Sequence, residues 1–156
     1  MRILIGLSAL ALALTVTGCG GKSAEEGVGA CKLLTPSDLE ATFDSPFRDG
    51  KPTHQDDTGA DQCVWTSSGG TFSITVLSQD RLAGAFKSNG MKVADLFEQA
   101  KLAYPNAKAI DLGDKAFASV SEVQVLDRDT WYSLSFHGAG TVEKLTELAT
   151  RVVRRH

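Results

Sequence analysis

Two stretches of alternating apolar and polar residues, each folded back by a turn, constrain this chain more than any other feature. The first, QCVWTSSGGTFSITVLS, spans residues 62–78 and turns at 67–70. The second pairs residues 122–126 with 130–137 around a turn at 127–129. A period of two places every second side chain on one face, and two such runs joined by a short turn predict a β-hairpin. We therefore expect two antiparallel hairpins, each with an apolar face that other elements must cover.

Helix signals alternate with these hairpins. Thr35 and Pro36 are a favourable N-cap and first position for a helix that ends near Asp44. Apolar residues recur at helical spacing over 93–104 and 142–153, with a weaker pattern before the first of these segments. The order of elements predicts an α+β fold, in which an antiparallel sheet of two hairpins plus short strands packs against about three helices.

The remaining segments fit a single domain over residues 31–156. The polar segment 48–62 is expected to be a surface loop with a short edge strand, and 111–119 a turn followed by a short strand. Apolar residues make up 42% of the chain and charged residues 22%, which is ordinary for a globular protein. The net charge is -3 and the basic residues are dispersed, apart from a group at 151–155, which argues against a nucleic-acid partner.

Residues 1–18 have the layout of an export signal. Arg2 precedes an apolar run over 3–16, which is shorter than the roughly 20 residues that span a bilayer and fits the core of a signal peptide. The sequence Val16-Thr17-Gly18-Cys19 resembles the lipobox of bacterial lipoproteins. The resemblance implies cleavage before Cys19, acylation of its thiol by chains such as palmitate, and attachment to the extracytoplasmic face of the cell membrane.

Cys19 would otherwise be a disulfide partner or a free thiol. With Cys19 set aside, Cys31 and Cys63 form an even pair, and in an oxidising compartment we expect them to form a disulfide. A metal site at this pair is the alternative, but no histidine accompanies it at a ligand spacing. Residues 19–30 are rich in glycine and charge and are expected to be a lipidated flexible linker.

Two tryptophans mark a possible ligand groove. Trp65 and Trp131 both fall on predicted hairpin strands, and Trp131 alternates with Ser133, Ser135 and His137. Large aromatic side chains beside small ones can line a groove, although they can equally fill space beneath a helix. The candidate groove residues are therefore Trp65, Trp131 and His137.

No motif predicts catalysis, a metal or a cofactor. The chain has no G-x-S-x-G elbow and no phosphate-binding glycine motif. Asp56, Asp57 and Asp61 could hold a hard cation, but they lack the spacing of an EF-hand loop, and a solvated acidic loop is the simpler interpretation. The stretch Gly138-Ala139-Gly140 before the last helix could face an anion, but a loop with an N-cap explains it.

Three short motifs carry a family resemblance. Cys31-Lys32-Leu33-Leu34-Thr35-Pro36-Ser37-Asp38, followed by Cys63-Val64-Trp65, is similar to the C-x-L-L-T-x-x-[DE] and C-x-[WY] motifs of actinobacterial cell-envelope lipoproteins of unknown function. The segment 112–117, LGDKAF, resembles their G-[LM]-G-D-x-A-[FYW] motif, with Asp111 in place of the first glycine. The resemblance implies an exported lipoprotein with one disulfide and an α+β domain, and it brings no catalytic residues.

These observations favour a binding or interaction module that is not an enzyme. Its partners would be the membrane, through the lipid anchor, and an envelope protein or lipid. A carrier of small apolar ligands or lipids is the alternative, and an unrecognised hydrolase is a third hypothesis that the lack of a histidine–nucleophile motif disfavours.

Overall fold

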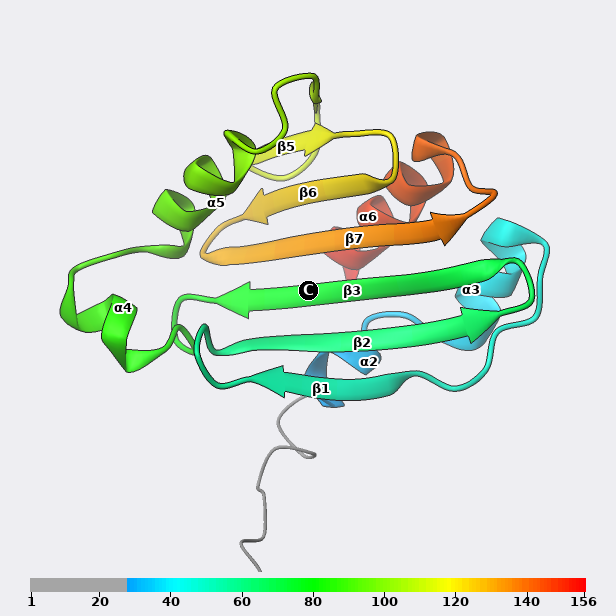
Figure 1. The fold of residues 1–156 in the computed structure, drawn as a ribbon, viewed down its shortest axis with the longest axis horizontal. Coiled ribbons are helices and arrows are strands. Elements are labelled where there is room, and N and C mark those ends of the chain that lie inside the picture. Colours follow the sequence, from blue (N-terminus) through cyan, green and yellow to red (C-terminus); the bar gives the residue numbers. More distant parts are fainter. Residues whose placement is uncertain (1–27) are drawn as a thin grey trace, which may run out of the picture.

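The computed structural model describes residues 28–156. One seven-stranded sheet forms its centre, with all neighbouring strands antiparallel in the order β1-β2-β3-β7-β6-β5-β4 (Figure 1). The strands are β1 (Lys51–Gln55), β2 (Ala60–Ser67), β3 (Gly70–Ser78), β4 (Lys108–Ile110), β5 (Lys115–Ala118), β6 (Glu122–Asp127) and β7 (Thr130–Gly138). The described helices are α2 (Val28–Cys31), α3 (Pro36–Phe43), α4 (Gly84–Ser88), α5 (Val93–Lys101) and α6 (Val142–Arg155). The predicted signal peptide, Cys19 and the linker up to residue 27 lie outside the described residues.

Both predicted hairpins are present, as β2–β3 and β6–β7. The pairing of β3 with β7, in which Ile74 lies opposite Leu134, joins them in the middle of one continuous sheet. The α+β class and the antiparallel sheet are thus confirmed. The short edge strand expected within 48–62 is β1, whose Pro52 is tolerated because an edge strand leaves part of its backbone unpaired. β4 was not predicted, since three residues are too few to show an alternating pattern.

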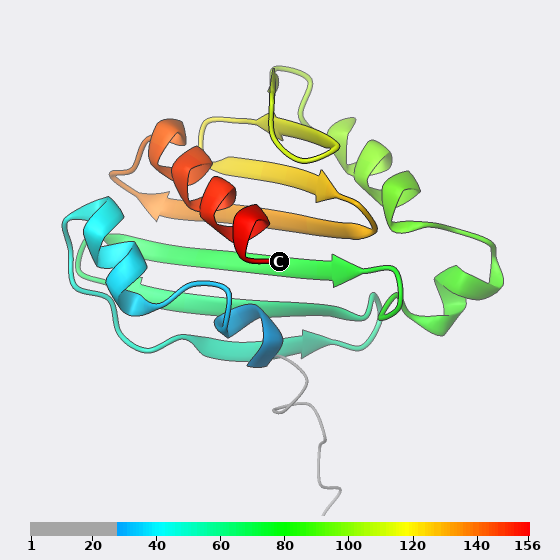
Figure 2. The same ribbon diagram turned by 180° about the vertical axis from the view of Figure 1, so that it is seen from behind.

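α2, α3 and α6 cross one face of the sheet (Figure 2). α6 buries one stripe of apolar side chains against it and exposes the opposite stripe, as an amphipathic surface helix does. The largest fully buried side chains of this core come from β2, β3, β7, α3, α6 and the segment that leads into α3. They include Trp65, Tyr132, Phe72, Leu34, Leu39, Ile74, Leu134, Leu145 and Leu148.

A second, smaller core lies on the other face, beneath α5. Phe97 of α5 packs against Phe117 of β5 and meets the ring of Trp131 nearly at a right angle. The other buried residues of this cluster are Ala60, Leu77, Leu82, Val93 and Leu126. The expectation of about three helices on one apolar face was therefore wrong in detail, because the described residues form five helices and both faces of the sheet carry a core.

The disulfide between Cys31 and Cys63 is present, with the two Cα atoms 5.1 Å apart. It joins the end of α2 to the middle of β2. Ala30 is 1% exposed and packs in the main core, so the ordered domain begins before residue 31 and the predicted linker is shorter at this end. The reason is that apolar contacts, together with the disulfide, hold the last residues of that segment in α2. Among the described residues, no helix has the length and apolar character needed to cross a membrane.

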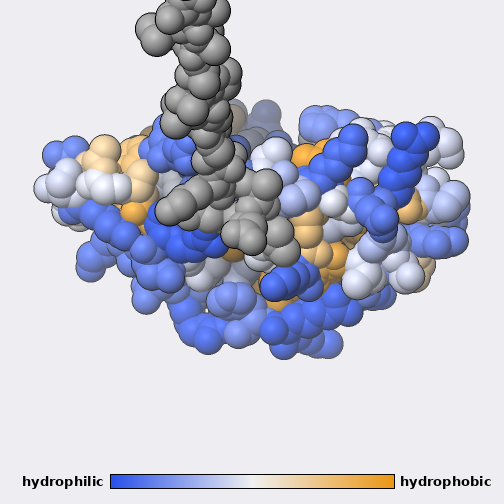
Figure 3. Space-filling model, turned by 90° about the horizontal axis from the view of Figure 1, so that it is seen from below, coloured by the Kyte–Doolittle hydropathy of each residue, from blue (hydrophilic) through white to orange (hydrophobic). Residues whose placement is uncertain are grey.

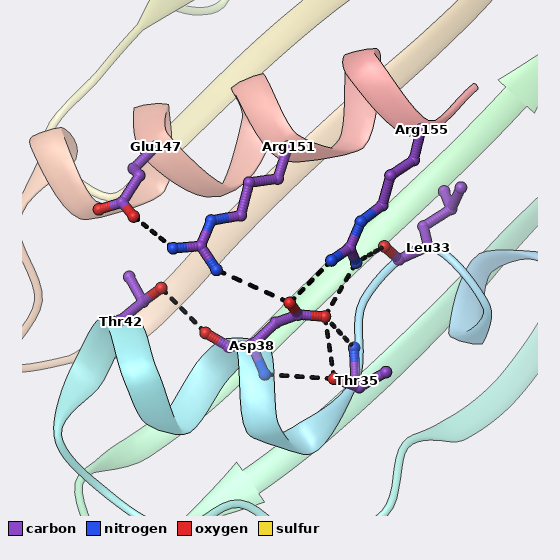
Figure 4. A network of polar contacts seen from close by, with 7 residues as sticks. All are labelled: Leu33, Thr35, Asp38, Thr42, Glu147, Arg151 and Arg155. Atoms are coloured by element: carbon purple, nitrogen blue, oxygen red, sulfur yellow. Dashed lines mark hydrogen bonds and ion pairs between the residues drawn. The ribbon is translucent and has the colours of Figure 1, made fainter.

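A network centred on Asp38 joins α3 to α6 (Figure 4). Thr35 and Asp38 form a reciprocal capping box at the start of α3. Arg155 donates to both carboxylate oxygens of Asp38, at 2.9 Å each, and to the carbonyl oxygen of Leu33 at 3.0 Å. The Arg155 guanidinium, with the hydrogen bonds from Thr35, holds the pKa of Asp38 well below its usual range. Arg151 lies 3.7 Å from the same carboxylate, so these two cations at the end of the chain fix α6 on α3.

Candidate functional site

The face of the sheet that carries α5 is covered by this helix at one end only, and α4 lies beyond the ends of the strands (Figure 1). None of the other described helices crosses the remainder of this face, which we call the open face. The strands present alternate residues on it because their side chains have a period of two. The open-face side chains of β1, β2, β3 and β7 are Lys51, Thr53, Gln55, Gln62, Val64, Thr66, Thr71, Ser73, Thr75, Trp131, Ser133, Ser135 and His137.

Most of these side chains are small and hydroxylated, and they bond to one another across strands. Ser73 and Ser135 are directly opposite and their hydroxyl oxygens lie 2.8 Å apart. The Gln62 amide donates to the Thr75 hydroxyl at 3.2 Å. The open face is therefore a mainly polar surface, and hydrogen bonds between neighbouring strands hold several of its side chains.

A groove of about 300 Å³ lies where the open face meets the end of α5. Trp131 of β7 and Tyr104, which follows α5, contribute its aromatic rings. The lining residues are Gln55, Thr58, Ala60, Thr75, Leu77, Ala100, Tyr104, Gln124, Trp131 and Ser133. This volume is at the small end of the range of about 300–1,000 Å³ that is usual for small-molecule sites.

A chain of hydrogen bonds connects the two aromatic residues of the groove. The Trp131 indole N–H donates to the Gln124 side-chain oxygen at 2.7 Å, and the Gln124 amide nitrogen donates to a Glu122 carboxylate oxygen at 3.2 Å. The Tyr104 hydroxyl donates to the same Glu122 oxygen. Gln124 is 3% exposed, so its orientation is fixed by both partners. The groove is therefore largely pre-formed.

The carboxylate of Glu122 also changes the acidity of Tyr104. Its hydrogen bond with the phenol, together with burial, raises the pKa of Tyr104 to about 12. The hydroxyl therefore keeps its proton, and its hydrogen bond to Glu122, to a higher pH than an ordinary tyrosine would.

The structure separates the three predicted groove residues. Trp131 lines the groove, and His137 is exposed on the open face at the opposite end of β7. Trp65 is 1% exposed and packs against Phe72 beneath the helices of the opposite face, with ring centroids 5.6 Å apart. Assigning Trp65 to the groove was therefore wrong, because it shares its face of β2 with Cys63 and not with Gln62.

Sequence reasoning missed Tyr104, Gln124 and Gln55 as lining residues. One signal was available for Gln124, since a glutamine alternates with buried valines in the sequence EVQVLD of β6. No signal was available for Gln55 or Tyr104, because they reach the groove from an edge strand and from a helix end that are distant in the sequence.

The acidic stretch that could have held a cation is divided in the structure. Asp61 is 4% exposed and accepts from Arg81 at 2.5 Å, while His54 Nδ1 lies 2.7 Å from its other oxygen. Asp56 and Asp57 are exposed in the turn before β2. Within residues 28–156, no group of three histidine, cysteine or acidic side chains is placed to hold a metal ion.

A second, larger groove of about 540 Å³ lies beside the N-terminal end of α6. Ile110, Ala118 and Val142 contribute apolar surface, and Val120 at its rim is 92% exposed. Lys108 and Glu143 place charges of both signs in the lining.

Seen toward the β1 edge, the molecule is mostly hydrophilic, with hydrophobic side chains confined to a few small areas (Figure 3).

Comparison of the chain with family models, with curated proteins and with solved structures found no match. The functional assignment therefore depends on the sequence motifs and on the geometry of the groove.

Proposed function

We propose that this protein is a lipid-anchored lipoprotein of the cell envelope that acts as a non-catalytic binding module outside the cytoplasm. Its binding site is the groove at Trp131. The observation that carries the proposal is the composition of that groove, whose aromatic, amide and hydroxyl side chains are suited to hold a ligand. A pre-formed site of this kind binds without paying to order its own side chains.

The anchor and the location are supported by the lipobox-like sequence at Cys19 and by the disulfide. Disulfides form and persist in oxidising compartments. Each acyl chain contributes about 0.8 kcal/mol per buried methylene. A single acyl chain binds a membrane only reversibly, whereas two or three would hold the protein there stably. The resemblance to actinobacterial cell-envelope lipoproteins fits the same assignment.

Metabolic labelling with a radioactive or clickable fatty acid tests the anchor. The wild-type chain should incorporate the label and sediment with membranes, and Cys19→Ala should abolish both, because the thiol is the acylation site. The matched control is the variant in which Cys31 and Cys63 are both replaced by alanine, which keeps Cys19 and should remain labelled. A Cys19→Ala chain that still incorporates fatty acid would contradict the proposed anchor.

Native mass spectrometry of the full chain purified from its membranes tests the binding module. We expect wild-type protein to retain an envelope ligand as a mass increment that Trp131→Ala removes, because Trp131 supplies an aromatic ring of the groove. Lys108→Ala, in the second groove, is the matched control and should retain the increment. An unmodified mass under all gentle purification conditions would count against a pre-formed ligand site.

The lipid-carrier alternative is favoured by one observation, the larger groove of about 540 Å³ beside α6, to which Ile110, Ala118 and Val142 contribute apolar surface. The same experiment separates the two functions. A lipid increment that persists in Trp131→Ala and is lost when Val142 is replaced by a charged residue would assign the carrier function to the second groove.

A further inference from the structure

We propose that the groove at Trp131 binds an uncharged saccharide and that the open face accommodates further sugar units of the same chain. This inference rests on the proposed binding function and names its ligand class. It is carried by three features of the groove, which are its lack of charge, its aromatic rings and its array of hydroxyl and amide groups.

Charge complementarity points to a neutral ligand. Among the described residues that line the groove, none is charged. The nearest carboxylate, that of Glu122, already accepts hydrogen bonds from Tyr104 and Gln124. A phosphate, carboxylate or ammonium group entering this groove would lose water without meeting an opposite charge, which is costly. The lining therefore disfavours nucleotides, acidic peptides and phospholipid headgroups.

The aromatic rings supply the apolar part of saccharide recognition. A pyranose ring has one face of C–H bonds, which packs on the electron-rich face of an indole or phenol. Trp131 and Tyr104 both line the groove, and the hydrogen bonds through Gln124 and Glu122 hold their rings in place. Small side chains, Ala60 and Ala100, leave room beside the rings for a bulky polar ligand.

The remaining lining matches the hydroxyl groups of a sugar. Gln55, Thr58, Thr75 and Ser133 offer hydroxyl and amide groups that both donate and accept hydrogen bonds. A sugar hydroxyl likewise donates and accepts, so each contact can be satisfied in either direction. Thr75 already accepts from Gln62, and Thr58 donates to Gln55, so each keeps only part of its hydrogen-bonding capacity for a ligand. A lipid tail would take this remaining capacity out of water and offer no hydrogen bond in return, which disfavours an apolar ligand at this site.

The open face continues this chemistry away from the groove. Ser133 and Thr75 are opposite one another at the edge of the groove, and the next open-face pair along the same strands is Ser135 and Ser73. Glu122 of β6 lies directly opposite Ser135, and its carboxylate accepts from Tyr104 and Gln124. Lys51 lies toward the other end of β1 from Gln55. An oligosaccharide that enters the groove with one unit would therefore meet the hydroxyl groups of Ser73 and Ser135 with the next unit, and affinity should rise with chain length.

The test uses the two tryptophans of the chain as separate reporters. The full chain is purified in a detergent without a sugar headgroup. Trp65→Phe leaves Trp131 as the reporter in the groove, and Trp131→Phe leaves the buried Trp65 as a control on the opposite face. The probes are neutral oligomers of glucose, mannose and N-acetylglucosamine, from monosaccharide to hexasaccharide, with uronic-acid oligomers as charged counterparts.

We expect at least one neutral series to give a saturable change in Trp131 emission and none in Trp65 emission, with calorimetry supplying the affinity. Trp131→Ala and Thr75→Ala should each weaken binding, by about tenfold or more for Trp131→Ala. Thr150→Ala removes a hydroxyl from α6 on the opposite face and should leave binding unchanged. Thr75→Ala keeps the aromatic core intact, so it remains informative even if Trp131→Ala folds poorly.

Three results would overturn the saccharide inference. They are equal affinity for neutral and uronic-acid oligomers, binding that survives both groove variants, or no binding by any neutral series. If no saccharide binds but native mass spectrometry shows a different ligand that depends on Trp131, the proposed binding function is supported and the saccharide inference is contradicted. If neither experiment shows a ligand that depends on Trp131, both fall.

Discussion

Replacing Cys31 and Cys63 together by alanine should lower the free energy of unfolding by about 3–4 kcal/mol. The bond closes a sequence separation of 32 residues, and removing it returns to the unfolded chain the conformations that this loop excludes. Cys63 is fully buried beside Trp65. Gly50 packs closely against both residues, since a Cβ added to Gly50 would lie 2.5 Å from the sulfur of Cys63. The decrease in the free energy of unfolding therefore has two sources. Packing contacts between α2 and β2 are weakened, and the unfolded chain gains conformational entropy.

Urea unfolding followed by circular dichroism measures this change. The midpoint should fall and the dependence on denaturant should steepen, because an unfolded chain without the cross-link exposes more surface. Wild-type protein unfolded with a reducing agent provides an independent comparison and should approach the double variant. A loss below about 1 kcal/mol with an unchanged slope would show that the bond contributes little to this fold.

Replacing Trp65 by alanine should cost about 3–5 kcal/mol, the range for deleting a large aromatic side chain from a core. Its ring packs against Phe72, and an added Cβ at Gly50 would lie 2.7 Å from it, so the indole fills a close-packed space under α2 and α3. The substitution would leave a cavity where the indole had been. This cavity cannot close by a movement of β2 alone, because β2 is paired with β1 on one side and β3 on the other.

The matched variant is Trp131→Ala on the other face. Trp131 is partly exposed, so its loss should cost only about 1–2 kcal/mol, while it removes the binding expected of the groove. Thermal and urea unfolding of the two variants, measured beside ligand retention, give the comparison. If Trp131→Ala proved the more destabilising of the two, Trp131 would be chiefly a core residue under α5 and not part of a binding surface.

Local features of the fold were predictable from the sequence. The alternation within 62–78 and 130–137 identified both hairpins, and Thr35-Pro36 located the start of α3 because a capping box is a local interaction. The cysteine pair was predictable because, once Cys19 is set aside for the predicted anchor, only Cys31 and Cys63 remain to pair. The role of Arg151 and Arg155 could not be predicted, because Arg155 bonds to Asp38, which lies 117 residues away in the sequence.

By itself, the sequence determined the antiparallel α+β class, the hairpins and the identity of the disulfide. The tertiary structure alone decided that β3 pairs with β7, that helices cover both faces, and that Trp65 and Trp131 lie on opposite ones. A period of two divides the residues of one strand between two faces, but it does not specify which face a helix will cover. The groove depends on that choice, because its residues come from β1, β2, β3, β6, β7 and the end of α5, and only their packing brings them together.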